Sequence, residues 1–326
     1  MDQWLMRTNC ETIRDYWIRH IYHKSSSSSF EPHLTIEKIL LKYREIRIPK
    51  SSCEKRYAAD SMLYGDNYLS RTLKEVTDRF VKVIKLSKKT KLSSECESTL
   101  RDIIYRIVCY NLSLSFVLRL AAIPYDSSIH SHTEMLMSLW NNLVQADRLR
   151  PVHSKDKYVF PTKIRSDIPD AAAIVSDRWA HIGFQGEDPG TDFRGMGLLG
   201  LKQLEYLSSK ELALDLLKRS LNAKHGYPFA IVGINITYNL VNLFKEGVMK
   251  HLYYDCGDAL FRDVDGKFRV IKTFNDLYIE LFLRFDYFWR KSKPENILAF
   301  PEIMQEFINL IKMDLCDRTF SFKFVC

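Results

Sequence analysis

The chain has 326 residues, of which 46% are hydrophobic and 27% are charged, and this composition excludes a largely disordered protein. Its formal net charge of +8 favours an acidic partner, which leaves nucleic acid, anionic lipid and an acidic protein surface open. Seven cysteines occur without a C-x-x-C pair or histidines at the spacing of zinc ligands, so we expect reduced thiols, no metal site and a cytoplasmic protein.

The spacing of the apolar residues predicts an all-α protein. Glycine and proline are scarce, with 12 and 10 residues, and long stretches carry Leu, Ile, Phe, Lys and Glu at helical spacing. We expect a single multi-helix domain with a helical N-terminal extension. The predicted boundaries are an N-terminal helix with a serine linker at 1–30, a helical region at 31–94, the domain itself at 95–314 and a C-terminal tail at 315–326.

The first predicted helix, at 4–24, is amphipathic, with Ile13, Trp17 and Ile21 on one face. Such a helix either lies on an anionic membrane surface or packs against the protein's own core, and the pattern leaves both interpretations open. Charges are scattered through the first residues, so we expect no secretory signal. The longest apolar stretch, 229–241, is interrupted by polar residues, and we interpret it as a core helix.

Further helices are predicted in chain order on both sides of a charged, proline-containing connector at 150–169. They lie at 35–47, 68–88, 96–120 and 131–147, and then at 172–182, 196–207, 209–220, 228–247, 272–291 and 300–314.

Four local patterns refine these elements. The arrangement Ser131-x-x-Glu134 indicates a capping box at the start of its helix. The lysine run at 85–91 either contacts acidic lipid or nucleic acid, or is the solvated end of a helix. The stretch 267–273 is the one that resembles a strand, and it could equally be a loop that leads into the next helix. In the helix 272–291 the aromatic spacing predicts a buried stripe, made of Phe274, Tyr278, Phe282, Phe285 and Trp289.

The segment from Trp179 to Tyr206 holds half of the chain's 12 glycines, and this density predicts tight turns that join two helices. Polar residues lie among these turns: Gln185, Asp188, Thr191, Asp192 and Arg194. We expect Asp192 to orient the guanidinium of Arg194, and Thr191 or Asp192 to cap the helix that begins near Met196. Residue types alone leave two interpretations, a loop tied down by an Arg–Asp pair or a functional site. A phosphate-binding loop is not indicated, because G-x-x-x-x-G-K-[ST] is absent.

One long run resembles the signature of the ELMO-domain family, in its ELMO-domain-containing branch. The run is G-F-Q-G-x-x-P-x-T-D-F-R-G-M-G-x-L-G-L-x-x-L from Gly183 to Leu204, and the stretches 134–140 and 226–237 resemble the same branch. The resemblance covers about 95–310. The motif positions that match one by one are Trp179, Gly183, Phe184, Gln185, Gly186, Pro189, Thr191, Asp192, Phe193, Gly195 and Gly197.

The resemblance implies an ELMO-type helical domain that acts as a GTPase-activating protein for Arf and Arf-like small GTPases. Arg194, the arginine of T-D-F-R-G, would be the catalytic residue, inserted in trans as an arginine finger. Gln185, Thr191 and Asp192 would support it, and the glycine, aromatic and proline positions would form the turns and contact the partner. The GTPase in its GTP-bound state would bind GTP and Mg²⁺, so this chain would need no cofactor and no independent catalytic activity.

Two other functions stay open. Some members of the ELMO family act as scaffolds for a guanine-nucleotide exchange factor, which makes a non-catalytic interaction module the alternative. Nucleic-acid binding would rest on the net charge and the lysine run, and we do not expect it, because no recognised motif supports it. The isolated His181 and His225 have no nucleophile beside them in the sequence, so we predict structural or surface roles for them. We expect a cytoplasmic protein, with peripheral contact to an organelle membrane through the N-terminal helix as a second possibility.

Overall fold

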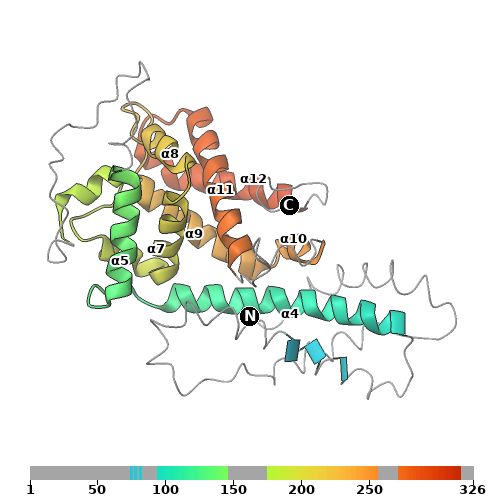
Figure 1. Ribbon diagram of the computed structural model, residues 1–326. Helices are drawn as coiled ribbons and strands as arrows, with labels where there is room; N and C mark the ends of the chain where they lie inside the picture. Colours follow the sequence, from blue (N-terminus) through green and yellow to red (C-terminus); the bar gives the residue numbers. More distant parts are fainter. Residues whose placement is uncertain are drawn as a thin grey trace. The chain divides into compact units, whose positions relative to one another are not determined.

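The computed structural model describes residues 94–145, 175–255 and 271–316, together with a few positions between 74 and 82 (Figure 1). Every regular element in these ranges is a helix, which confirms the all-α prediction. In chain order they are α4 (Ser94–Ala122), α5 (His130–Trp140), η2 (Asn141–Gln145), η3 (Asp177–Ile182), η4 (Pro189–Gly195), α7 (Gly197–Ser208), α8 (Leu212–Ser220), α9 (Phe229–Glu246), α10 (Lys250–Asp255), α11 (Lys272–Ser292), η6 (Ile297–Ala299) and α12 (Phe300–Cys316).

The chain divides into two compact units. One consists of 1–114 and 244–270, and the other of 115–243 and 271–326. In the first unit the buried Tyr110 donates its hydroxyl to the carbonyl of Phe244 at 2.5 Å. The rings of Phe244 and Tyr253 both meet the ring of Tyr110 edge-on, with centroids 4.7 Å and 5.2 Å away. These aromatic contacts form the core of the described part of this unit.

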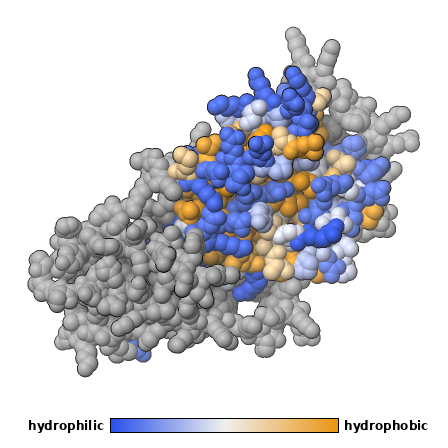
Figure 2. Space-filling model, turned by 180° about the vertical axis from the view of Figure 1, so that it is seen from behind, coloured by the Kyte–Doolittle hydropathy of each residue, from blue (hydrophilic) through white to orange (hydrophobic). Residues whose placement is uncertain are grey.

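The second unit is built around α11, which packs against α7, α8 and α12, while α5 packs on α7. The predicted aromatic stripe of α11 is confirmed, because all five of its side chains have 0% exposure. Aromatic residues bury large areas, so this stripe anchors the helices on which the candidate site rests. Seen from behind, the described surface is mostly hydrophilic, with hydrophobic patches between (Figure 2).

The predicted capping box at the start of α5 is wrong. The helix begins one residue earlier, at His130, and its N-cap, Ile129, makes no side-chain hydrogen bond. Thr133 donates its hydroxyl to the carbonyl of His130, and Glu134 lies 3.0 Å from the ring of His130. Ser131 lies inside the first turn, where its side chain cannot cap the helix. The helical path then continues beyond Trp140 as the π-helical turn η2.

Some other predictions change or lie outside the described residues. Within 172–182 the described part forms the short 3-10 helix η3 instead of an α-helix, and within 267–273 the last two residues belong to α11. The helix α10 was not predicted. The N-terminal helix, the helix at 35–47 and the lysine run lie outside the described residues.

One helical stretch of α4 is long and apolar enough to cross a membrane by length and composition alone. It is Ile104–Ala122, and 40% of it is buried. The choice of 229–241 as the longest apolar stretch was therefore wrong, because the few polar residues of α4 do not lower its mean hydropathy enough. Core helices of soluble proteins pass the same test.

Candidate functional site

Arg194 lies near the end of η4, the 3-10 helix between η3 and α7. Asp188 is the N-cap of η4, and its carboxylate accepts a hydrogen bond from the amide of Gly190 at 2.8 Å. Thr191 donates its hydroxyl to the carbonyl of Asp188 at 2.8 Å. Pro189 at the first position has a backbone angle suited to a helical turn. The start of η4 is thus fixed by contacts within four consecutive residues.

A series of aromatic contacts anchors η4 in the second unit. Phe193 packs against Phe184 with ring centroids 5.6 Å apart, and Phe184 packs against Trp179 at 5.7 Å. Trp179 meets Trp140 of α5 edge-on at 5.0 Å. Because Phe193 is buried, the backbone of its exposed neighbour Arg194 is fixed in position.

Six motif residues that the sequence assigned to turns and partner contact are buried in the structure: Trp179, Gly183, Phe184, Pro189, Phe193 and Gly197. They support the site from within the unit. Direct contact with a partner would therefore fall to the exposed motif members, which are Gln185, Gly186, Thr191, Arg194 and Gly195.

Asp192 has a different partner from the expected one. One of its carboxylate oxygens accepts a hydrogen bond from the backbone amide of Gln185 at 2.9 Å. Burial raises the pKa of Asp192, and this hydrogen bond and the positive charge of Arg194 oppose the rise. Asp192 therefore ties the turn after η3 to η4 and influences Arg194 through its charge.

The guanidinium of Arg194 is exposed, and its Nε donates to the carbonyl of Thr191 at 2.9 Å. Within the part of the chain that the structure describes, its two terminal nitrogens have no partner. In contrast, Arg219, Arg284 and Arg290 each pair with a carboxylate. The backbone of η4 thus holds the base of the guanidinium and leaves its outer edge available to a ligand.

The prediction that Thr191 or Asp192 caps the helix near Met196 is wrong. The helix α7 starts at Gly197, its N-cap is Met196, and no side chain caps it. Both polar residues lie inside η4, which ends before α7 begins. The amide of Leu198 instead donates to the carbonyl of Ile123 at 2.8 Å, which ties the start of α7 to another backbone segment.

The glycines of the segment have two different roles. Gly183 and Gly197 have positive φ angles of 85° and 50°, which favour glycine. A Cβ atom at either would lie 2.2 Å from another backbone atom, the amide of Phe229 or the carbonyl of Ile123. A Cβ atom at Gly186 or Gly195 would meet nothing within 4 Å. The packing of the unit therefore requires the first pair and does not explain the second.

Two residues near η4 were missed in the sequence. The ring of Tyr125 packs against Phe193 at 5.7 Å and stacks on His132 at 6.0 Å. His132 is buried, and its Nδ1 accepts a hydrogen bond from the amide of Asp126 at 3.1 Å. Burial lowers the pKa of His132 and raises the pKa of Tyr125 to about 12. No spacing in the sequence links these residues to the motif, because they lie more than forty positions before it.

The two histidines near the motif have separate surroundings. His181 is exposed, and His225 donates from Nδ1 to the carbonyl of Pro294 at 2.9 Å. Among the described residues, no group of three or more His, Cys, Asp or Glu side chains is placed to hold a metal ion. The exposed guanidinium of Arg194 is the charged group near the end of η4.

Residues 115–304 match the ELMO/CED-12 family, and the chain belongs to this family. It is 37% identical to ELMO domain-containing protein 2 of Homo sapiens over 196 residues, which are 60% of this chain and 57% of that protein. It is 37% identical to ELMO domain-containing protein B of Dictyostelium discoideum over 189 residues, 57% of this chain and 54% of that protein. With ELMO domain-containing protein 1 of Mus musculus it shares 30% identity over 228 residues, 64% of this chain and 61% of that protein. The chain thus spans less than two thirds of the length of these relatives. No solved structure matches it.

Proposed function

We propose that this chain stimulates GTP hydrolysis by Arf-family small GTPases, Arf or Arf-like, with Arg194 inserted in trans as an arginine finger. The observation that carries the proposal is the exposed guanidinium of Arg194, bound through Nε to the carbonyl of Thr191. The motif around it, T-D-F-R-G at 191–195, resembles that of the family's GTPase-activating branch. GTP and Mg²⁺ would be bound by the partner.

The chemistry of phosphoryl transfer suits this arrangement. Negative charge on the transferring phosphoryl group is stabilised by a cation placed beside it in a site closed to water. A guanidinium is always charged, and its planar fork can bind two phosphate oxygens at once, which the single ammonium of lysine cannot do. An arginine finger of this kind raises the rate by about 10³ to 10⁵.

The surroundings of Arg194 support insertion into a partner. The Thr191 carbonyl fixes Nε, and the two terminal nitrogens have no partner among the described residues. Asp192 holds the neighbouring turn through the amide of Gln185. Gly186 and Gly195 add no side chain to the surface, which lets the backbone of a partner approach closely.

The alternative is a non-catalytic interaction module in small-GTPase signalling. Such a module would bind a GTPase or another signalling protein through the same exposed surface without changing the rate of hydrolysis. The free edge of the Arg194 guanidinium argues against a residue that only ties down a loop, and a hydrolysis assay separates the catalytic proposal from the interaction module.

A panel assay tests the proposal and identifies the partner. Purified Arf and Arf-like GTPases loaded with GTP are mixed with the full chain, and phosphate release is measured for each. We expect accelerated hydrolysis with at least one of them. GTP-dependent binding to a panel member without acceleration would instead establish the interaction module.

A further inference from the structure

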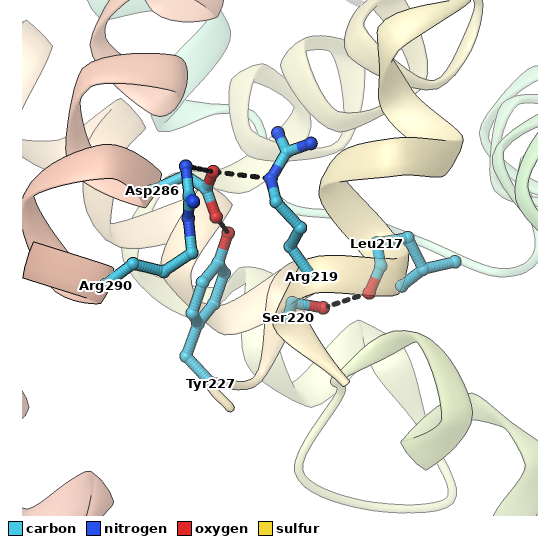
Figure 3. Close-up of polar contacts among 6 residues, drawn as sticks. All are labelled: Leu217, Arg219, Ser220, Tyr227, Asp286 and Arg290. Carbon is cyan, nitrogen blue, oxygen red and sulfur yellow. Dashed lines mark hydrogen bonds and ion pairs between the residues drawn. The ribbon is translucent and has the colours of Figure 1, made fainter. Parts of the chain in front are cut away.

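A second surface lies where α8 and α11 end. The buried Asp286 of α11 accepts hydrogen bonds from Nε of Arg219 at 2.7 Å and from the hydroxyl of Tyr227 at 2.9 Å, and it lies 3.2 Å from Arg290 (Figure 3). These contacts join the last turn of α8, the segment after it and the last turns of α11. We name the segments 218–227 and 286–299 the basic tip.

Hydrogen bonds also join the two segments of the basic tip to each other. His225 donates from Nδ1 to the carbonyl of Pro294, and Trp289 donates from Nε1 to the carbonyl of His225, both at 2.9 Å. Trp289 is fully buried. The tip is therefore a fixed surface built on the core of its unit.

Positive charge dominates the basic tip. Six Lys or Arg residues stand against two carboxylates, Asp286 and Glu295, and Asp286 is buried between two arginines. Three of the cations, Lys224, Lys291 and Lys293, are exposed and have no ion-pair partner within the described ranges. Their charge is therefore directed to the solvent or to an external anion.

Lys293 occupies a backbone position that disfavours it. It ends α11 in the left-handed conformation, with φ of 48°, and no other non-glycine residue of the described chain has a positive φ. Glycine is the usual residue at such a helix end, because a side chain there is strained. The backbone here therefore favours glycine, and the fold gains from the lysine only the weak attraction between its charge and the C-terminus of the helix.

Large apolar side chains of the basic tip are also exposed. Leu298 is 84% exposed and Ile297 is 43% exposed, both in the short helix η6. Asn296 caps η6 by accepting a hydrogen bond from the amide of Leu298 at 2.9 Å, which fixes the turn. On α11, the exposed Tyr287 lies one helical turn before Lys291. Exposure of these apolar side chains to water is unfavourable, and their burial against a partner would be favourable.

We propose that the basic tip docks on an anionic lipid bilayer. Leu298 and Ile297 enter the interface between headgroups and acyl chains, and Lys224, Lys291 and Lys293 lie at the level of the lipid phosphates. Peripheral membrane surfaces combine an apolar insertion with basic residues in this way. Nucleic acid would use the lysines and leave Leu298 without a role. The inference does not depend on the proposed GTPase activation.

Vesicle binding tests this inference with the full chain and no GTPase. Flotation is measured with vesicles of phosphatidylcholine alone and of phosphatidylcholine with phosphatidylserine. The variant Lys224→Gln/Lys291→Gln/Lys293→Gln removes the three lysines, and Leu298→Ser removes the apolar projection. The matched controls are Arg119→Gln/Lys82→Gln/Lys245→Gln, which loses the same charge from exposed positions elsewhere, and Met313→Ser, which changes a side chain of α12 that is 70% exposed.

We expect the chain to bind the phosphatidylserine vesicles more tightly than the neutral ones. Each lysine near an anionic surface strengthens binding about fivefold, so the triple variant should bind about a hundredfold more weakly. Leu298→Ser should weaken binding roughly tenfold, and both controls should bind as the wild type does. The inference is overturned if the wild type does not bind these vesicles, if the tip variants bind as it does, or if the controls lose as much binding.

Lys293→Gly separates binding from folding. It removes one charge and the strained side chain together, so vesicle binding should fall about fivefold while the unfolding temperature stays the same or rises. If Lys293→Gly and the triple variant both bind the vesicles as tightly as the wild type does, the basic tip is not the membrane-binding surface.

Discussion

At the scale of single residues, the glycines show which parts of the motif serve the fold and which do not. Gly183 and Gly197 have positive φ and lie against other backbone segments, whereas Gly186 and Gly195 face open space. The sequence predicted a cluster of turns. It could not separate these roles, because the residue type alone does not show which backbone segments lie near each glycine. The separation comes from backbone atoms that are distant in the chain.

Gly195→Ala is expected to keep the fold and lose stimulated hydrolysis. The added methyl group meets nothing within 4 Å, so the free energy of unfolding should change by less than about 1 kcal/mol. Between Arg194 and an approaching partner backbone the same methyl group should cost about tenfold or more in stimulated rate. Thermal unfolding and the hydrolysis assay measure the two effects.

The comparison variant is Gly197→Ala, in which the new side chain is strained and lies 2.2 Å from the carbonyl of Ile123. It should destabilise the fold by about 1 to 3 kcal/mol. If Gly195→Ala kept full stimulation, close approach of a partner at this position would be ruled out.

His132 predicts a pH dependence of stability. It is buried and accepts a hydrogen bond at Nδ1, and burial lowers its pKa below the ordinary value of 6.5. Between the folded pKa and pH 6.5 the unfolded chain binds a proton that the folded chain does not bind. The stabilising contribution of this residue is therefore fully present above pH 6.5. It is lost as the pH falls from there through the folded pKa, with a slope of up to about 1.4 kcal/mol per pH unit.

The variant His132→Asn keeps an acceptor near the position of Nδ1 and does not titrate. Unfolding temperatures of both proteins between pH 7.5 and 5.0 should show a steeper decline in the wild type below pH 6.5. Parallel curves would show that His132 is protonated equally in both states.

At the scale of elements, the helices that could be predicted are those whose apolar spacing repeats over many turns. The stripe of α11 from Phe274 to Trp289 is such a case, and its burial is confirmed. The helix η4 was not predicted, because a short 3-10 helix has too few residues for a periodic signal. The aromatic contact between Trp140 and Trp179 joins residues with no regular spacing, so only the fold reveals it.

The link between η3 and η4 predicts different effects for two variants of Asp192. Asp192→Asn keeps an oxygen acceptor for the amide of Gln185 and removes a charge that burial disfavours. Its stability should match or slightly exceed that of the wild type. Asp192→Ala loses the hydrogen bond, which should lower the free energy of unfolding by about 1 kcal/mol and reduce the stimulated rate at saturating GTPase. Equal rates for both variants and the wild type would show that this link does not position Arg194.

At the scale of the whole molecule, one compact unit of 115–243 and 271–326 carries both Arg194 and the basic tip. If both proposals hold, docking of the tip limits the orientations in which Arg194 meets a GTPase on the same membrane. The composition, the helical class and the motif could be identified from the amino-acid sequence. The exposed guanidinium and the shared unit required the structure, because each depends on contacts between distant segments.

The most direct measurement is the single-turnover rate of GTP hydrolysis by a responsive Arf-family GTPase with three proteins: the wild type, Arg194→Lys and Arg119→Lys. Arg119 is an exposed arginine of the same unit, so its variant controls for the exchange of an arginine for a lysine. We predict that Arg194→Lys loses the stimulation by a factor of about 10³ or more, with unchanged thermal unfolding, and that Arg119→Lys retains it. Full stimulation by Arg194→Lys would contradict the assignment of Arg194 as the arginine finger.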